Sequence, residues 1–205
     1  MVGIGDSLKR TIDLITIEFA KKFSGKRVLE IGCGRGERIK LFADAGCNTY
    51  TIDITDLRNE DLLSGYSFLI GDGRNPPFKN EIFEAVVSFD VIEHIDNDIS
   101  FLSENYRICK NGGMLVLGTP NRNRLSHKLR QILGKRILYP LKIGKVCLHL
   151  IEYDMAGLAE LVNRAGFKVI KEEYVWFGLM GIIGFKKFPR FLNKWAQYLI
   201  IFAVK

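Results

Sequence analysis

The residues best suited to chemistry follow a predicted strand, in the run VLEIGCGRGER. The run contains Gly32, Gly34 and Gly36, and Glu30 precedes these glycines. Glycines at this spacing let a ligand approach the backbone, although an ordinary strand-to-helix turn would also use them. A dinucleotide-binding turn reads GxGxxG, whereas this one reads GxGxG, and Glu30 would repel a pyrophosphate. The turn therefore indicates a ligand without phosphates, whose amino group could pair with Glu30.

Two further carboxylates follow the next predicted strands. Asp53 ends a strand predicted over 48–52, and Asp72 lies in the run GDGRNPPF after a strand predicted over 66–70. The carboxyl ends of parallel strands meet at one edge of a sheet, so these side chains should lie near the glycine turn. Carboxylates accept hydrogen bonds from the hydroxyl and amino groups of a ligand.

The elements that position these residues alternate between strand and helix. Strands are predicted over 26–31, 48–52, 66–70, 83–89, 114–118, 167–175 and 198–204, and helices over 6–23, 37–45, 99–109 and 154–165. This alternation is typical of a doubly wound α/β sheet. Asn111, Gly112 and Gly113 are expected to end the helix before the fifth strand. With about 150 residues per domain as a guide, residues 1–205 are expected to form a single domain.

The run from Glu30 to Gly36 resembles the first motif of class I S-adenosylmethionine (SAM)-dependent methyltransferases, and the later motifs keep that family's order. The resemblance implies a Rossmann-like sheet of seven strands with the last strand antiparallel. It implies SAM as the cofactor and S-adenosylhomocysteine (SAH) as the product, with Asp53 on the ribose hydroxyls and Asp72 on the adenine amino group. The implied cofactor-binding residues are Glu30, Gly32, Cys33, Gly34, Gly36, Asp53, Ile54, Asp72, Gly73, Arg74, Phe89, Asp90 and Glu93.

The run from Asp90 to His94, DVIEH, follows the predicted fourth strand, where a methyl acceptor should lie. A neutral imidazole at His94 is a candidate base for a substrate hydroxyl, and a buried or capping histidine is the alternative. His149, before the helix predicted over 154–165, is a second candidate. The run resembles that of ubiquinone-biosynthesis O-methyltransferases, of methyltransferase type 11. This resemblance favours transfer to an oxygen, rather than nitrogen or carbon, of a small-molecule or lipid-linked acceptor.

The same run also resembles small-RNA 3′-end 2′-O-methyltransferases, in which an equivalent set of residues holds a divalent metal. Here the set would be Asp90, Glu93, His94 and His149, and its oxygen and nitrogen donors would suit Mg²⁺ or Mn²⁺. Asp90 is one methylene shorter than the glutamate that this family has at the first position. We therefore favour the alternative in which Asp90 and Glu93 line the SAM site and no metal is bound.

The net charge of +7 comes from a basic insert over about 120–150. Residues 119–151 contain eight basic residues and no acidic one, whereas the rest of the chain carries 22 basic and 23 acidic residues. The apolar spacing predicts an amphipathic helix from Leu125 to Arg136. This helix would be a lid with an ordinary core face, a membrane-surface helix near an anionic acceptor, or a nucleic-acid patch. Tyr139 is the one aromatic residue of the insert, which counts against nucleic acid.

Further acceptor contacts are expected near this insert. Tyr153, Arg122 and Arg124 are candidates for the acceptor site, and His127 is expected at the surface. An apolar stretch over about 176–194 resembles an interfacial loop, with a partner interface or a buried loop as alternatives.

The composition excludes several classes of protein. Of the 205 residues, 47% are hydrophobic and 26% are charged, which is typical of a globular chain. No apolar run approaches the ~18 residues of a membrane span, and charges interrupt the N-terminal apolar runs, so no signal peptide is expected. Four scattered cysteines indicate reduced thiols in a cytoplasmic protein, which could lie peripherally at an anionic membrane. The alternative functions are a metal-dependent RNA 2′-O-methyltransferase and a non-catalytic, membrane-associated SAM-binding protein.

Overall fold

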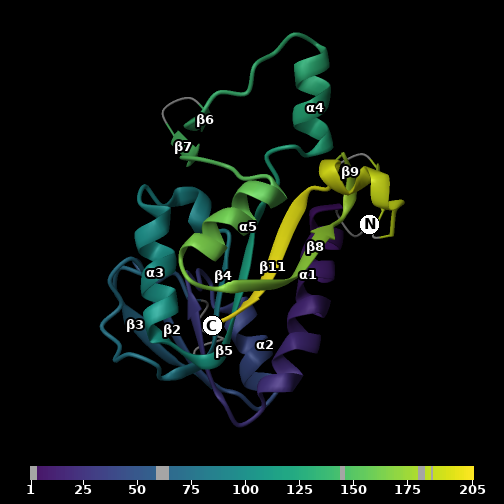
Figure 1. Ribbon diagram of the computed structural model, residues 1–205. Helices are drawn as coiled ribbons and strands as arrows, with labels where there is room; N and C mark the ends of the chain where they lie inside the picture. The colour runs from purple at the N-terminus through teal and green to yellow at the C-terminus, as the bar shows by residue number, and fades with distance from the viewer. Residues whose placement is uncertain (1–3, 59–64, 144–145, 180–182, 186) are drawn as a thin grey trace.

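A seven-stranded sheet lies at the centre of the computed structural model, in the order β3-β2-β1-β4-β5-β11-β8 (Figure 1). The structure describes residues 4–58, 65–143, 146–179, 183–185 and 187–205. The strands of this sheet are β1 (Arg27–Ile31), β2 (Asn48–Asp53), β3 (Ser67–Ile70), β4 (Phe83–Phe89), β5 (Cys109–Pro120), β8 (Lys168–Val175) and β11 (Tyr198–Val204). The first five run parallel, and β11 is antiparallel to both β5 and β8. This arrangement confirms the predicted doubly wound sheet with an antiparallel last strand.

Helices cover both faces of the sheet (Figure 1). They are α1 (Ile4–Ala20), α2 (Glu37–Asp44), α3 (Asp98–Ile108) and α5 (Met155–Arg164), with short 3-10 helices over Lys21–Phe23, Ile92–His94 and Arg190–Trp195. Leu29 and Ile31 of β1 join the core under α3 and α5, whereas Val28 joins the core under α1 and α2. Because both faces are buried, the central parallel strands are hydrophobic almost throughout.

The start of β5 corrects one expectation from the sequence. Asn111, Gly112 and Gly113 do not end α3, which stops at Ile108. They lie inside β5, where the Gly112 N–H donates to the Lys205 carbonyl at 3.1 Å and the Lys205 N–H donates to the Gly113 carbonyl at 3.0 Å. Pairing with Lys205 thus draws these residues into an irregular start of the strand.

The insert after β5 forms a helix and a hairpin beyond the carboxyl ends of the strands (Figure 1). The helix, α4 (Leu125–Ile132), is shorter than predicted, and its expected continuation to Arg136 is wrong. Gly134, with a φ of +73°, turns the chain away from the helix instead. The strands β6 (Leu141–Ile143) and β7 (Val146–His149) then pair antiparallel.

The apolar stretch over 176–194 divides between the core and the surface. Its small hairpin consists of β9 (Phe177–Leu179) and β10 (Ile183–Phe185). Trp176 is fully buried, whereas Phe185 is exposed. Residues 180–182 and 186 of the predicted interfacial loop lie outside the described residues. None of the described helices has the length and apolar character needed to cross a membrane.

Candidate active site

A first cavity of about 650 Å³ opens at the carboxyl ends of β1, β2 and β4. A volume of this size suits a small-molecule ligand. Eight of the thirteen predicted cofactor-binding residues line it, namely Gly32, Gly34, Asp53, Ile54, Asp72, Gly73, Arg74 and Asp90. The other five, which are Glu30, Cys33, Gly36, Phe89 and Glu93, are not among its lining residues. His94, the candidate base, also lines the cavity. The lining residues that were not predicted from the sequence are Ile31, Ile52, Val91, Ile95, Asp96, Phe101 and Leu150.

The glycine turn after β1 is held in place by Asp53. The Gly34 N–H donates to Asp53 Oδ2 at 2.8 Å, and the Thr55 N–H donates to Asp53 Oδ1 at 3.2 Å. Gly32 has a φ of +80°, and a Cβ atom there would lie 2.2 Å from Cγ2 of Val91. Glycine at position 32 therefore allows the turn after β1 to pack against the turn after β4.

Asp72 forms a charged pair with Arg74 in the wall of the first cavity. Arg74 Nη2 lies 2.7 Å from Asp72 Oδ2, and Arg74 Nη1 lies 2.7 Å from Asp96 Oδ1. The side-chain hydrogen bond from Arg74, together with one from its backbone, lowers the pKa of Asp72. The Asp72 carboxylate is therefore ionised at neutral pH, and its remaining lone pairs can accept hydrogen bonds from a ligand.

Glu30 is a buried carboxyl group next to the glycine turn. Its side chain is only 1% exposed, and Oε2 has no hydrogen-bond partner among the described residues. Burial raises the pKa of Glu30 to about 7, against the opposing effects of the Arg38 charge and a hydrogen bond from the Ile39 backbone. A cationic ligand group close by would favour the ionised form of this carboxyl group.

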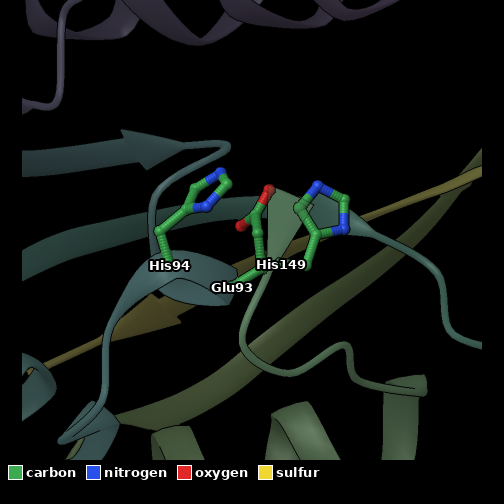
Figure 2. Close-up of side chains that lie close together, drawn as sticks. All are labelled: Glu93, His94 and His149. Atoms are coloured by element: carbon green, nitrogen blue, oxygen red, sulfur yellow. The ribbon is translucent and has the colours of Figure 1, made fainter. Parts of the chain in front are cut away.

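The backbone joins the turn after β4 to the segment before α5. The Glu93 carbonyl accepts hydrogen bonds from the Leu150 N–H at 2.8 Å and from the Ile151 N–H at 3.3 Å. As a result, the rings of His94 and His149 lie 5.2 Å apart between centroids. Figure 2 shows the Glu93 carboxyl group between the two imidazoles, and one ligand atom from each of the three residues lies within 4.8 Å of the others.

Burial dominates the electrostatics of this cluster. Burial, followed by the charge of Asp90, raises the pKa of Glu93 to about 8. Glu93 Oε2 accepts a hydrogen bond from the Thr119 hydroxyl at 2.9 Å, while Oε1 has no partner among the described residues. Burial and the neighbouring His149 lower the pKa of His94. At pH 7 Glu93 is therefore largely protonated, and the neutral His94 imidazole can accept a proton.

A second cavity, of about 500 Å³, lies between α1, α2 and the end of β5. Its lining residues are Leu8, Lys9, Ile12, Glu37, Arg38, Asp90, Pro120, Arg124, His149, Gln197 and Tyr198. Asp90 lines both cavities, with His94 in the first and His149 in the second. The Asp90 side chain is open to the cavities but closely surrounded by protein, and this desolvation raises its pKa. The two cavities therefore share one carboxyl group, and each has one histidine in its wall.

The three predicted acceptor contacts and His127, all in or next to the insert, have different surroundings. Arg124 lines the second cavity, and Arg122 lines a third cavity of about 220 Å³. Tyr153 is not a lining residue of either large cavity, and its hydroxyl donates to Asp98 Oδ2 at 2.7 Å. His127 was expected at the surface, but it is only 3% exposed because its ring packs inward with Nδ1 3.1 Å from the Arg122 carbonyl oxygen.

Comparison with known proteins decides the family. A model described as a methyltransferase domain matches residues 7–172. The chain belongs to this methyltransferase family. A probable S-adenosylmethionine-dependent methyltransferase of Mycolicibacterium smegmatis is 28% identical over 163 residues, which are 78% of this chain and 59% of that protein. A ubiquinone biosynthesis O-methyltransferase of Dechloromonas aromatica is 30% identical over 139 residues, which are 62% of this chain and 59% of that protein. This methyltransferase domain therefore spans about three fifths of the length of these two relatives.

The fold of this methyltransferase domain is also that of solved structures. A putative methyltransferase from Bacillus halodurans superposes with a TM-score of 0.70 at 18% identity, over 94% of this chain and 98% of that one. The family and the fold implied by the glycine turn are thus confirmed.

Several cavity residues of the methyltransferase domain were not predicted from its sequence. Arg38 of α2 and Tyr198 of β11 both line the second cavity, and because these elements are far apart in the sequence no local pattern indicates this. Glu152 is buried beside His149. Its one sequence signal is that it is the first acidic residue after the acid-free insert.

Proposed function

We propose that this chain binds SAM in the first cavity and transfers the methyl group of SAM to an oxygen of an acceptor in the second cavity. The observation that carries this proposal is the position of Asp90, which lines both cavities, with His94 in the wall of the first and His149 in the wall of the second. Membership of the methyltransferase family supports the methyl donor. The relative named as a ubiquinone biosynthesis O-methyltransferase supports an oxygen as the acceptor.

The first cavity offers groups that match those of SAM. Asp53 and Asp72 in its wall are acceptors for the ribose hydroxyls and the adenine amino group. Glu30, which is buried next to the glycine turn and is not part of this wall, is the proposed partner for the methionine amino group. Methyl transfer is an in-line displacement, so holding donor and acceptor in line supplies much of the acceleration. The sulfonium loses its charge during transfer, so the site needs no oxyanion hole.

The second cavity suits an anionic acceptor with an apolar part, either a small molecule or a lipid-linked one. Its wall includes apolar side chains of α1 and the cations Lys9, Arg38 and Arg124. Lys9 and Arg124 already pair with carboxylates. The Arg38 guanidinium lies 4.3 Å from the centroid of the Phe89 ring, and its buried Nε has no hydrogen-bond partner among the described residues. We therefore assign Arg38 to the negative group of the acceptor.

His94 is the proposed base for the acceptor hydroxyl, and His149 is the second candidate. Burial keeps His94 neutral, which a base requires, and His94 lies in the wall of the first cavity. His149 lies in the wall of the second cavity, on the acceptor side of Asp90.

The test is methyl transfer from labelled SAM to components of a cell extract, followed by identification of the labelled product. Wild-type protein should release SAH and label one class of acceptor. Arg38→Gln should raise KM for that acceptor about tenfold or more, through loss of a charge-assisted bond, while Lys40→Gln on the same helix should not. A wild-type protein that binds SAM but labels nothing would instead support the non-catalytic alternative.

A metal-dependent reaction, such as RNA 2′-O-methylation, is the second candidate, favoured by the Glu93, His94 and His149 cluster. One carboxylate oxygen and two imidazole nitrogens are a donor set that suits a divalent transition metal. The partnerless Glu93 Oε1 fits this interpretation, although Asp90, the fourth expected ligand, is not part of the cluster. A bound metal would lower the pKa of an acceptor hydroxyl. Activity lost in EDTA and restored by Mn²⁺ would establish this candidate, and activity unchanged by EDTA would remove it.

Peripheral contact with an anionic membrane is the proposed role of the insert. Three apolar residues of α4 and the following turn are exposed, with Leu129 38%, Ile132 70% and Leu133 75% exposed. If α4 were a lid with an ordinary core face, these apolar side chains would be buried against the rest of the protein. Arg122, Lys128 and Lys194 line the third cavity beside α4, and none of the described lining residues there is acidic. Exposed apolar side chains among cations are typical of a helix that lies on an anionic lipid surface.

Co-sedimentation with liposomes tests this role of the insert. Wild-type protein should sediment with vesicles that contain phosphatidylglycerol, and binding should weaken as salt rises because surface charges are screened. Absence of binding at low salt would contradict the membrane proposal while leaving the proposed reaction untouched.

A further inference from the structure

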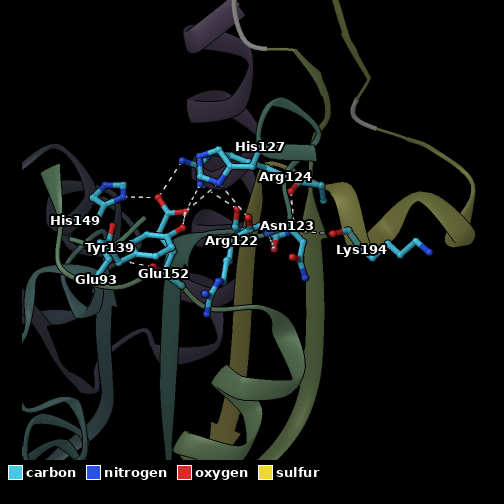
Figure 3. A network of polar contacts seen from close by, with 12 residues as sticks. Glu93, Arg122, Asn123, Arg124, His127, Tyr139, His149, Glu152 and Lys194 are labelled. Carbon is cyan, nitrogen blue, oxygen red and sulfur yellow. Dashed lines mark hydrogen bonds and ion pairs between the residues drawn. The ribbon is translucent and has the colours of Figure 1, made fainter. Parts of the chain in front are cut away.

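The carboxylate of Glu152 is the centre of a buried polar network between the insert and the active site (Figure 3). Its side chain is fully buried. Arg124 donates twice, with Nη1 at 2.5 Å from Oε2 and Nη2 at 2.9 Å from Oε1. The Tyr139 hydroxyl donates to Oε2 at 2.7 Å, and His149 Nδ1 lies 2.5 Å from Oε1.

All three partners lie in the insert of about 120–150, two of them at the start of α4 and in the segment after it, whereas His149 ends β7 and also belongs to the candidate active site. Arg124 stands at the start of α4, and Tyr139 lies after it. His149 lines the second cavity and is close to His94. A charge buried in this way is stable only while it is paired and hydrogen-bonded. The carboxylate therefore connects the position of the insert to that of the imidazole.

An ionised carboxylate can only accept hydrogen bonds. The hydrogen at His149 Nδ1 must therefore point at Glu152 Oε1, and a neutral ring with a hydrogen on Nδ1 carries a lone pair on Nε2. A carboxylate partner of this kind fixes both the tautomer and the orientation of an imidazole. In free neutral imidazole side chains both tautomers occur, so Glu152 would select one of them.

We infer that Glu152 is a positioning residue that holds His149 as the Nδ1–H tautomer at the acceptor site, and that Arg124 and Tyr139 of the insert hold Glu152. The inference deepens the proposed function, because it names the residue that prepares His149 for contact with the acceptor. The insert is then a structural part of the active site as well as a candidate membrane contact.

The experiment is ¹⁵N NMR of the histidine ring nitrogens at pH 8.5, where ordinary imidazoles are neutral. In the wild type, His149 should show a protonated Nδ1 and an unprotonated Nε2. In Glu152→Gln, which keeps the volume of the side chain, His149 should lose this preference. Tyr139→Phe should preserve it because Arg124 still holds the carboxylate, and Glu160→Gln on the exposed face of α5 should have no effect.

Kinetics supply the second readout if methyl transfer is observed. Glu152→Gln should lower kcat about 10- to 100-fold without changing KM for SAM, because Glu152 is not in the wall of the first cavity. A wild-type His149 with its hydrogen on Nε2, which needs no variant to detect, would overturn the inference. An unchanged tautomer in a folded Glu152→Gln variant would overturn it as well. The NMR result stands even if no acceptor is found, so failure of the inference and failure of the proposed reaction are distinguishable.

Discussion

At the scale of single residues, two buried carboxyl groups set the chemistry of the site. Glu30 and Glu93 are both almost completely buried, and burial raises their pKa values to about 7 and about 8. Asp72 differs because Arg74 lowers its pKa. These three carboxyl groups near strand ends therefore differ in charge state at neutral pH, which their residue types alone do not indicate.

Glu30 should make the stability of the ligand-free protein depend on pH. Between pH 4.5 and 7 the unfolded chain ionises Glu30 while the folded chain keeps it protonated, so stability falls as pH rises through this window. Glu30→Gln removes this effect. The quantity to follow is the free energy of unfolding of Glu30→Gln minus that of wild type. This difference should become more positive by up to about 3 kcal/mol as the pH rises from 4.5 to 8.

Urea unfolding at several pH values measures this difference. Glu160→Gln, an exposed glutamate on α5, is the control and should show no such trend. A difference between Glu30→Gln and wild type that is constant with pH would mean that Glu30 is not protonated in the folded protein.

At the scale of elements, the turn after β1 depends on steric fit as well as on backbone conformation. Gly32 and Gly34 both have positive φ, of +80° and +52°. A Cβ at Gly32 would collide with Val91, whereas a Cβ at Gly34 would meet no atom within 4 Å. Alanine at position 34 would therefore lose stability through the backbone conformation alone. Alanine at position 32 would also lose stability through steric overlap with the turn after β4.

Gly32→Ala should destabilise the protein more than Gly34→Ala. The left-handed conformation alone costs about 1 kcal/mol for alanine, and overpacking against Val91 adds about 1–3 kcal/mol at position 32. Chemical denaturation of both variants, compared with wild type, measures the difference. Equal losses of stability would show that the turn after β4 does not pack as described.

The parts of the fold that could be predicted are those that local patterns determine. β4 and β11 have their predicted bounds because each is a mainly apolar run, interrupted in β4 by Glu84 and Ser88 only. The end of α4 is marked by Gly134, a local stop signal that the apolar spacing beyond it obscured. The start of β5 could not be predicted, because it depends on pairing with Lys205, which is distant in the sequence. The first cavity follows from motifs at strand ends, whereas the second is assembled from elements far apart in the sequence.

At the scale of the whole molecule, the positive charge is separated from the cofactor site. The insert carries the excess charge beyond the carboxyl ends of the strands (Figure 1), and the rest of the chain is close to neutral. The charge therefore concerns the acceptor and its surroundings, not the binding of SAM. Membrane contact and SAM binding should then be separable by mutation.

The double variant Ile132→Ser, Leu133→Ser should bind anionic liposomes about tenfold more weakly or worse than wild type, since it removes two exposed apolar side chains. Its affinity for SAH should be unchanged. Leu14→Ser removes an apolar side chain of α1 that is 57% exposed, and it should affect neither property. Parallel loss of liposome and SAH binding in the double variant would contradict the separation of the two functions.

The proposed reaction requires SAM to bind in the first cavity, and titration calorimetry with SAM and SAH measures this binding. Both ligands should bind the wild type with one site per chain. Asp53→Ala should weaken binding by about 1–3 kcal/mol, because it removes a charged acceptor from the ribose hydroxyls. Asp53→Asn, which retains one oxygen for the Gly34 N–H, should bind with intermediate affinity. A folded wild-type protein that binds neither ligand would contradict the account.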